Sequence, residues 1–371
     1  MKIGIPAETR PGETRVAATP ETVKKLIAAK HQVVVQAGAG LSASVTDDAF
    51  QAAGAQIGTA ADAFGSEMVL KVRAPSADER ATMASGTVVV GMLNPFDADN
   101  VAAMAAHGLT AFALEAAPRI SRAQSMDVLS SQANIAGYKA VLMAANTYGR
   151  FMPMLMTAAG TVKAARILIM GVGVAGLQAI ATAKRLGAVI EASDVRPPVK
   201  EQVESLGAKF LDVPFITDEE REIAQGSGGY ARAMPADWMQ RQAALVHERA
   251  KLADIIITTA LIPGRRAPVL ISEDTVKAMK PGSVIVDMAV EQGGNCPLSE
   301  LNKTVTKYGV HIIGQPDLAT LVPADASALY ARNVLDFLKL IVGPEAALAI
   351  NRDDEIVAAT LLCTGGEVLR K

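Results

Sequence analysis

The chain has 371 residues, half of them hydrophobic, and its 36 basic and 38 acidic residues leave a formal net charge of −2. Without a basic surplus to neutralise nucleic-acid phosphates, we expect no nucleic-acid partner. The only cysteines, Cys296 and Cys363, are too few for a metal cluster or a disulfide framework, and they agree with a reducing compartment.

The apolar stretches are interrupted by polar residues. No uninterrupted run reaches the roughly 20 residues that span a bilayer. The best candidate, Ala140 to Val162, contains Asn146, Arg150 and Pro153. The N-terminus lacks the apolar stretch of a signal peptide. We therefore expect no transmembrane segment in this chain, and we attribute its positive mean hydropathy to a buried core, oligomer contacts or both.

Short apolar segments of β-strand type alternate with helical segments, which is the pattern of α/β domains with parallel sheets. The first series of predicted strands is Lys2–Ile5, Gln32–Gln36, Met68–Val72, Thr87–Gly91 and Thr110–Ala113. The second series is Arg166–Met170, Val189–Ser193, Asp254–Thr258, Ser283–Asp287 and Val310–Ile313. Two series predict two sheets, and hence two Rossmann-like domains joined by long connector helices.

The first connector is predicted over Ser131 to Tyr148, where apolar residues recur at helical spacing. A second helical pattern, Ala326 to Ile341, follows the last strand. The tail then predicts a hairpin, formed by Ile356–Cys363, a double-glycine turn and Glu367–Leu369. The predicted domains are a discontinuous N-terminal domain, 1–130 plus 330–371, and a second domain, 140–325.

The segment from Val213 to Trp238 interrupts this alternation, because it contains no convincing strand and is rich in glycine. An irregular segment this long in a compact domain is functional or disordered. Two interpretations stay open: a surface insertion without function, and a lid that closes over a ligand.

The most specific motif starts where Arg166–Met170 ends. It runs Gly171-Val-Gly173-Val-Ala-Gly176, and a helical stretch follows, then the strand Val189–Ser193 and Asp194. Strand, glycine turn, helix, strand and acid in this order predict a dinucleotide site. The first glycine permits the tight turn, the second lets the backbone approach the pyrophosphate, and the third allows close helix–strand packing. The pyrophosphate is expected on the N–H groups at the positive end of the helix.

The acid at the end of this motif predicts the choice of cofactor. The Asp194 carboxylate can accept hydrogen bonds from the adenosine ribose hydroxyls and repels a 2′-phosphate, which favours NAD(H) over NADP(H). Arg196 lies two residues further on and weakens that preference, because an arginine there can accommodate a 2′-phosphate.

Seven segments, spread over nearly the whole chain, carry a family resemblance: Glu8–Ala17, Leu70–Val72, Arg119–Gln132, Gly171–Gln178, Gly228–Ala231, Thr258–Gly264 and Asp287–Gly294. In these segments the chain resembles the NAD(H)-binding component, domain I, of the proton-translocating nicotinamide nucleotide transhydrogenases. The alanine dehydrogenases are related and share the fold. The resemblance implies NAD(H) bound to this chain and NADP(H) bound to a partner subunit.

The segment Arg119–Gln132 distinguishes the two related families. The resemblance implies that Arg119, Asp127 and Ser130 contact the nicotinamide and its ribose, and that Gln124 reaches toward the partner's NADP(H). The residue types alone allow another interpretation, in which Arg119 and Asp127 form a surface ion pair and the serines cap the connector helix.

The resemblance also implies that Gly228–Met234 is a mobile loop that folds onto bound nucleotide. Together with the glycine turn and its acid, this gives the predicted cofactor-binding residues: Gly171, Gly173, Val174, Ala175, Gly176, Asp194, Val195, Arg196, Gly229, Tyr230, Ala260 and Leu261.

The alanine dehydrogenases transfer protons as well as hydride, so they need a general acid–base. Their pattern pairs a lysine, here Lys71, with a histidine after the next strand, but here that strand is followed by Met-Leu-Asn94-Pro95. Glu291 also stands where an aspartate is expected. Arg15 and Lys71 could still bind an acid carboxylate. An amino-acid dehydrogenase therefore stays as the alternative, and a non-catalytic NADH sensor as a third hypothesis.

Hydride transfer between two nicotinamides needs alignment and exclusion of water, with no titrating group or metal. The resemblance implies a proton-translocating, Si/Re-specific enzyme split over several polypeptides. This chain would be a homodimeric peripheral subunit on the cytoplasmic face of the inner membrane. Its partners would be an NADP(H)-binding subunit and a membrane subunit.

Overall fold

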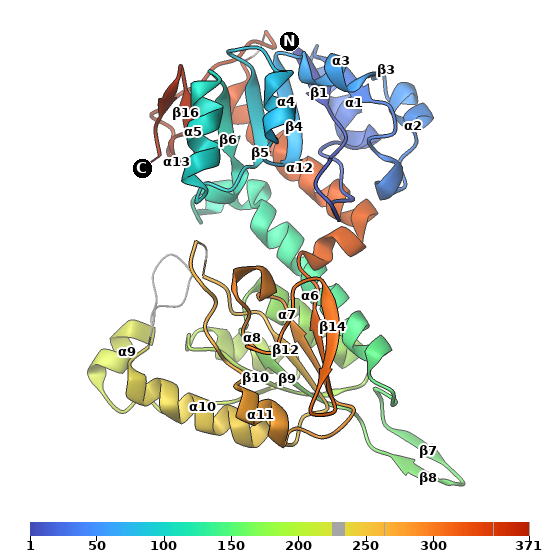
Figure 1. The fold of residues 1–371 in the computed structure, drawn as a ribbon, viewed down its shortest axis with the longest axis vertical. Coiled ribbons are helices and arrows are strands. Elements are labelled where there is room, and N and C mark those ends of the chain that lie inside the picture. The colour runs from blue at the N-terminus through green and yellow to red at the C-terminus, as the bar shows by residue number, and fades with distance from the viewer. Residues whose placement is uncertain (225–233, 263, 344, 371) are drawn as a thin grey trace. The chain divides into compact units, whose positions relative to one another are not determined.

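The structure, a computed structural model, describes residues 1–224, 234–262, 264–343 and 345–370 (Figure 1). The chain forms two compact units. Unit 1 comprises Met1–Gln132 and Ala319–Lys371, and unit 2 comprises Ala133–Leu318. In each unit a largely parallel sheet is flanked by helices, so the prediction of an α/β fold with two Rossmann-like domains is confirmed.

The sheet of unit 1 has eight strands in the order β17-β16-β6-β5-β4-β1-β2-β3. The strands from β6 to β3 are parallel, and β16 and β17 add to the edge antiparallel. Their bounds are β1 Lys2–Ile5, β2 Gln32–Gln36, β3 Gln56–Gly58, β4 Met68–Arg73, β5 Val88–Met92, β6 Thr110–Ala113, β16 Leu361–Thr364 and β17 Glu367–Val368. Strands β5 and β6 are buried along their whole length, because apolar clusters cover both faces of the sheet.

The α-helices of unit 1 are α1 Pro20–Ala28, α2 Asp47–Ala52, α3 Ala60–Phe64, α4 Ala77–Ala81, α5 Ala98–Ala106, α12 Pro323–Ile341 and α13 Glu355–Thr360. Short 3-10 helices are η1 Leu41–Ala43, η2 Leu114–Ala116, η3 Ser121–Met126 and η5 Leu318–Leu321. The long helix α6, Val128–Thr147, begins in unit 1 and continues into unit 2.

The tail corrects one prediction. The strand expected from Ile356 begins only at Leu361, because the preceding residues form α13. Asp354 starts this helix: its Oδ1 accepts the backbone N–H groups of Ile356 (2.8 Å) and Val357 (3.2 Å). A short apolar run does not by itself distinguish a buried helix from a strand.

The sheet of unit 2 has seven strands in the order β11-β10-β9-β12-β13-β15-β14. All pairs are parallel except β14 with β15. The bounds are β9 Arg166–Met170, β10 Val189–Ser193, β11 Lys209–Phe210, β12 Ile255–Thr258, β13 Val284–Asp287, β14 Lys303–Lys307 and β15 Val310–Gly314. The first strand in sequence, β9, lies between β10 and β12. The chain therefore changes direction across the sheet at the carboxyl end of β9, where doubly wound sheets bind ligands.

The helices of unit 2 are α7 Val174–Arg185, α8 Val199–Ser205, α9 Asp218–Ala224, α10 Ala236–Ala250, α11 Glu273–Ala278 and the 3-10 helix η4 Val290–Gln292. Helix α9 corrects the prediction of an irregular segment from Val213 to Trp238. Within the described ranges, no helix is both long enough and apolar enough to cross a membrane.

A two-stranded hairpin, β7 Leu155–Thr157 and β8 Gly160–Val162, was not predicted (Figure 1). Large apolar side chains in it and in the segment that leads into it are exposed: Phe151 is 56% exposed, Met154 62% and Met156 71%. A lone hairpin is marginally stable in water. These side chains are exposed to solvent in the part of the chain that the structure describes.

Candidate functional site

The glycine turn connects β9 to α7. Gly171 has a φ of +92°, a backbone conformation that favours glycine, and its N–H donates to the carbonyl oxygen of Ser193 in β10 (2.9 Å). A β-carbon on Gly176 would lie 2.1 Å from the Gly171 carbonyl oxygen, so only glycine lets α7 pack this closely on the turn. These two glycines shape the turn.

Gly173 faces open space instead. It is the N-cap of α7, with φ −82° and ψ −162°, and a β-carbon there would meet no atom of the described residues within 4 Å. The N–H groups of Val174, Ala175 and Gly176, in the first turn of the helix, have no acceptor within an α-helix. Open space in front of these N–H groups fits the pyrophosphate of a dinucleotide.

Asp194, at the end of β10, is tied to this turn. Its Oδ2 accepts the N–H of Val172 (2.7 Å) and Nη2 of Arg196 (2.8 Å), while Oδ1 accepts the backbone N–H and Nε of Arg196, both at 2.9 Å. The carboxylate is nearly buried, and its hydrogen bonds raise the pKa of the Arg196 guanidinium. The acid therefore stands beside the turn, but an arginine of the same loop already occupies it.

The loop after β12 borders the turn on its other side. Thr259 donates from Oγ1 to the Gly171 carbonyl oxygen (2.8 Å) and from its N–H to Met170 (2.8 Å). The next residue, Ala260, is fixed by Asn295, whose Nδ2 donates to its carbonyl oxygen (2.9 Å). The side chain of Leu261 is exposed. The structure thus brings together the turn, the Asp194 loop and the Ala260 loop within unit 2.

Two predicted cofactor-binding residues, Gly229 and Tyr230, lie outside the described residues, as does most of the predicted loop Gly228–Met234. Met234, where the description resumes, is buried against Trp238 in a small apolar cluster.

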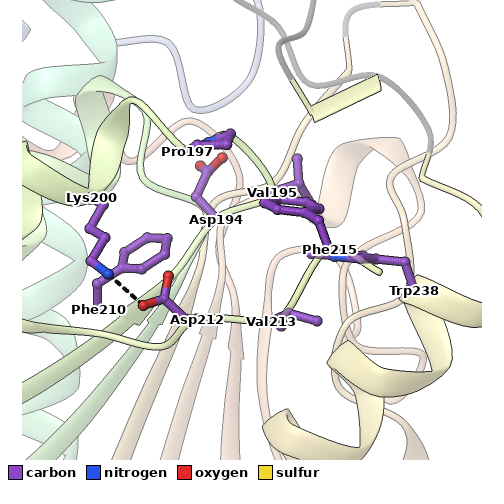
Figure 2. A pocket seen from close by; sticks show the side chains of 9 residues that line it. All are labelled: Asp194, Val195, Pro197, Lys200, Phe210, Asp212, Val213, Phe215 and Trp238. Carbon is purple, nitrogen blue, oxygen red and sulfur yellow. Dashed lines mark hydrogen bonds and ion pairs between the residues drawn. The ribbon is translucent and has the colours of Figure 1, made fainter. Parts of the chain in front are cut away.

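A pocket in unit 2 opens beside Asp194 (Figure 2). It is lined by Asp194, Val195, Pro197, Lys200, Phe210, Asp212, Val213, Phe215 and Trp238. The indole of Trp238 stacks on the ring of Phe215, with centroids 6.0 Å apart and an interplanar angle of 11°. The sequence placed Trp238 at the edge of a loop, whereas it lies in the first turn of α10 and is 1% exposed.

Trp238 gives this pocket an intrinsic fluorescent probe, because it is the only tryptophan of the chain. We expect NADH to change its emission and NADPH to change it much less, since Asp194 lines the same pocket and disfavours a 2′-phosphate. Titration of each nucleotide measures this, with Trp238→Phe as the blank. Equal responses to the two nucleotides would contradict the role given to Asp194.

The predicted nicotinamide segment lies in unit 1, over η3 and the start of α6. Arg119 and Gln124 are exposed, and Asp127 and Ser130 are partly buried. The Asp127 carboxylate accepts the N–H of Ser130 at Oδ1 (2.9 Å) and its hydroxyl at Oδ2 (2.6 Å), so Asp127 caps α6. This hydrogen-bonded pair places both polar side chains at the helix start.

Asn333 of α12 fixes this segment to the body of unit 1. Its Nδ2 donates to the carbonyl oxygen of Ser125 (2.8 Å), and its Oδ1 accepts the hydroxyl of Ser131 (2.7 Å). Sequence reasoning did not single out Asn333, because nothing in a helical pattern marks which polar residue faces a neighbouring segment.

The two cations that could bind a substrate carboxylate are buried against carboxylates of this chain. Arg15 pairs with Glu13 (2.6 Å) and donates to Gln132 Oε1 (2.8 Å). Lys71 pairs with Glu79 (3.0 Å) and with Glu8 (3.3 Å). The side chains of these ion pairs are at most 8% exposed. A substrate acid would have to break a buried ion pair to reach either cation, which is costly.

Glu115 lies in η2 after β6, and its carboxylate reaches the end of β5, where the alanine dehydrogenase pattern has a histidine. Its carboxylate accepts the backbone N–H groups of Leu93 (3.2 Å) and Asn94 (2.7 Å). Burial raises the pKa of this carboxyl from 4.5 to about 7. Sequence reasoning missed Glu115 because it lies 21 residues after Asn94 and no local pattern marks it.

The raised pKa predicts a pH dependence of stability. Between pH 4.5 and about 7 the folded chain holds a proton on Glu115 that the unfolded chain has lost. The contribution of Glu115 to the unfolding free energy is therefore complete below pH 4.5 and falls, by at most about 1.4 kcal/mol per pH unit, as pH rises toward 7. In Glu115→Gln, the unfolding free energy measured by urea titration should therefore decline less between pH 5 and pH 7 than in the unmodified chain. Equal declines in both proteins would contradict the assignment.

The order of the strands, the glycine turn, the helix N-terminus and the acid at the end of the second strand together define a dinucleotide-binding Rossmann domain in unit 2. The sequence matches "Alanine dehydrogenase/PNT, N-terminal domain" over residues 4–136 and "Alanine dehydrogenase/PNT, C-terminal domain" over residues 140–371. The chain belongs to this alanine dehydrogenase/PNT family.

Three relatives place the chain within the family. It is 52% identical to a Rhodospirillum rubrum protein named as the first portion of an NAD(P) transhydrogenase alpha subunit, over 100% of this chain and 98% of that protein. A transhydrogenase structure from Sinorhizobium meliloti has a TM-score of 0.89 at 51% identity, covering 99% of this chain and 100% of that one. An L-alanine dehydrogenase structure has a TM-score of 0.82 at 28% identity, covering 99% and 96%. The resemblance to transhydrogenase proteins is confirmed, and alanine dehydrogenase is the more distant relative.

Proposed function

We propose that this chain is the NAD(H)-binding component of a split, proton-translocating transhydrogenase. It would exchange hydride between the NAD(H) it binds and NADP(H) on a partner subunit. The observation that carries this proposal is the end-to-end similarity to the Rhodospirillum rubrum transhydrogenase subunit, well above the similarity to alanine dehydrogenase. The buried ion pairs of Arg15 and Lys71 support it, because they withhold the cations that an amino-acid dehydrogenase would use.

In this account the pyrophosphate lies at the N-terminus of α7 and the adenosine ribose at Asp194. Arg119, Asp127 and Ser130 hold the nicotinamide and its ribose, and Gln124 reaches the nucleotide of the partner. Bound NADH would supply the hydride, and these side chains would orient the ring and exclude water without transferring a proton. The other proposed cofactor contacts are Gly171, Gly173, Val174, Ala175, Gly176, Val195, Arg196, Ala260 and Leu261.

The proposed partners are an NADP(H)-binding subunit and a membrane subunit, with this chain docked on the cytoplasmic face of the inner membrane. A homodimer is also proposed. The exposed apolar side chains around the β7–β8 hairpin support it, because a second copy that covers them would bury surface that water otherwise contacts.

To test this, the purified chain is mixed with an NADP(H)-binding subunit, NADPH and an NAD⁺ analogue whose reduced form has a distinct absorbance. Reduction of the analogue is then followed by that absorbance. We expect exchange that requires both proteins, and Si/Re stereospecificity when the NAD(H) carbon is deuterated on one face. Exchange that fails with every such partner would reject the proposal.

The alternative, an alanine dehydrogenase-like enzyme, predicts that the chain alone oxidises NADH with pyruvate and ammonia. We expect no oxidation, because the carboxylate-binding cations are already paired. A chain that binds NADH but is inert with every redox partner would instead be the NADH sensor.

A further inference from the structure

Two cations and two carboxylates meet at the pocket beside β10. Arg196 is held by Asp194 through its Nε and Nη2 atoms. At the same pocket, Lys200 donates from Nζ to Oδ2 of Asp212 at 2.5 Å (Figure 2). Asp194, Lys200 and Asp212 line the pocket, so the carboxylate of the first pair and both members of the second pair lie at one site.

Among the described residues, four donors already fill the acceptor positions of Asp194. A carboxylate offers about four lone-pair positions. The four donors on Asp194 are the N–H of Val172 and the N–H, Nε and Nη2 of Arg196. Ribose hydroxyls can bind Asp194 only by replacing side-chain donors of Arg196, because the two backbone N–H groups are fixed by the fold. A ribose bound at Asp194 would therefore displace the Arg196 guanidinium.

The Lys200–Asp212 pair affects which nucleotide can bind once Arg196 has left Asp194. A displaced guanidinium and a free lysine ammonium at one pocket would form a binding site for a 2′-phosphate. The lysine is not free, because Asp212 holds it. Lys200 is 42% exposed and Asp212 60%, so solvent screens the pair and either side chain can turn without disturbing the core.

We propose that Asp212 is a second determinant of the preference for NAD(H) over NADP(H), and that it acts by holding Lys200 away from a 2′-phosphate. This inference rests on the proposed function, since it assigns the ribose of the dinucleotide to Asp194. Asp212 is a positioning residue, because its effect passes through the lysine. The two ion pairs together carry no net charge, and neutralising Asp212 leaves the charge of Lys200 unbalanced.

The test is direct binding of NADH and of NADPH to the full chain, by calorimetry at low salt. In Asp212→Asn we expect the ratio of the NADPH to the NADH dissociation constant to fall about tenfold, the effect of one charge-assisted hydrogen bond. The fall should shrink as salt is added, because the cation is partly exposed. Asp212→Glu, which keeps the pair, should retain the ratio of the unmodified chain.

Two matched variants isolate the mechanism. Asp218→Asn changes the net charge equally, at a fully exposed carboxylate paired with Arg221 outside the pocket, and should leave the ratio unchanged. Lys200→Gln combined with Asp212→Asn should abolish the fall. An unchanged ratio in Asp212→Asn, or a fall that persists without Lys200, would overturn the inference. If the unmodified chain bound no NADH, the proposed function itself would fail, and this inference with it.

Discussion

Replacement of Gly173 by valine should lower the affinity for NADH about 1,000-fold and leave unit 2 folded. The backbone of Gly173 has ordinary extended angles, and a β-carbon there meets no atom of the described residues within 4 Å, so we expect the fold to accept the side chain. The new side chain would enter the space in front of α7. Loss of two N–H···phosphate hydrogen bonds, each worth about 1.5–3 kcal/mol, accounts for the expected loss of affinity.

Gly176→Val is the matched comparison. Its β-carbon would lie 2.1 Å from the Gly171 carbonyl oxygen, so we expect a loss of stability along with the loss of binding. Urea unfolding and calorimetric titration of both variants separate the two effects. A Gly173→Val protein that is stable and binds NADH normally would remove the pyrophosphate from the glycine turn.

Asp127→Asn should slow hydride exchange with the NADP(H)-binding partner about 100-fold, the penalty of a misplaced reacting group. NADH binding should change little, because most of the nucleotide is held in unit 2. The substitution is informative because Asp127 caps α6 through Ser130, and asparagine caps a helix as well as aspartate does. A purely structural Asp127 would therefore tolerate the change.

The control for this variant is Asp97→Asn, which makes the same substitution at another helix cap of unit 1, the N-cap of α5. We expect it to exchange hydride at the rate of the unmodified chain. If Asp127→Asn also exchanges at that rate, Asp127 is a capping residue only and has no role in holding the nicotinamide.

Much of the fold followed from local patterns in the sequence. The buried parallel strands were predictable, because their apolar runs are bounded by turn residues and repeat with helices between them. Strand β9 and its glycine turn were the clearest, since the three glycines stand at spacings that a turn and a close helix require. The hairpin β7–β8 was missed because its strands have three residues each.

The features of the site that escaped prediction depend on contacts between distant residues. Asp212 and Phe215 follow a strand of two residues, and they line a pocket only because β11 pairs with β10. Glu115 reaches the end of β5 across neighbouring strands, and Asn333 reaches η3 from the far end of the chain. The sequence shows residue types and periodicity, whereas these contacts require the sheet order.

Direct hydride transfer from NADH on this chain to NADP⁺ on a partner subunit can be followed with deuterium. NADH carrying deuterium at the reactive nicotinamide carbon is bound to this chain and mixed with NADP⁺ on the partner subunit. We expect the deuterium to pass to NADPH and none of it to enter water, because no group of the proposed site exchanges a proton with the ring. Deuterium recovered in alanine after addition of pyruvate and ammonia, with none in NADPH, would contradict it.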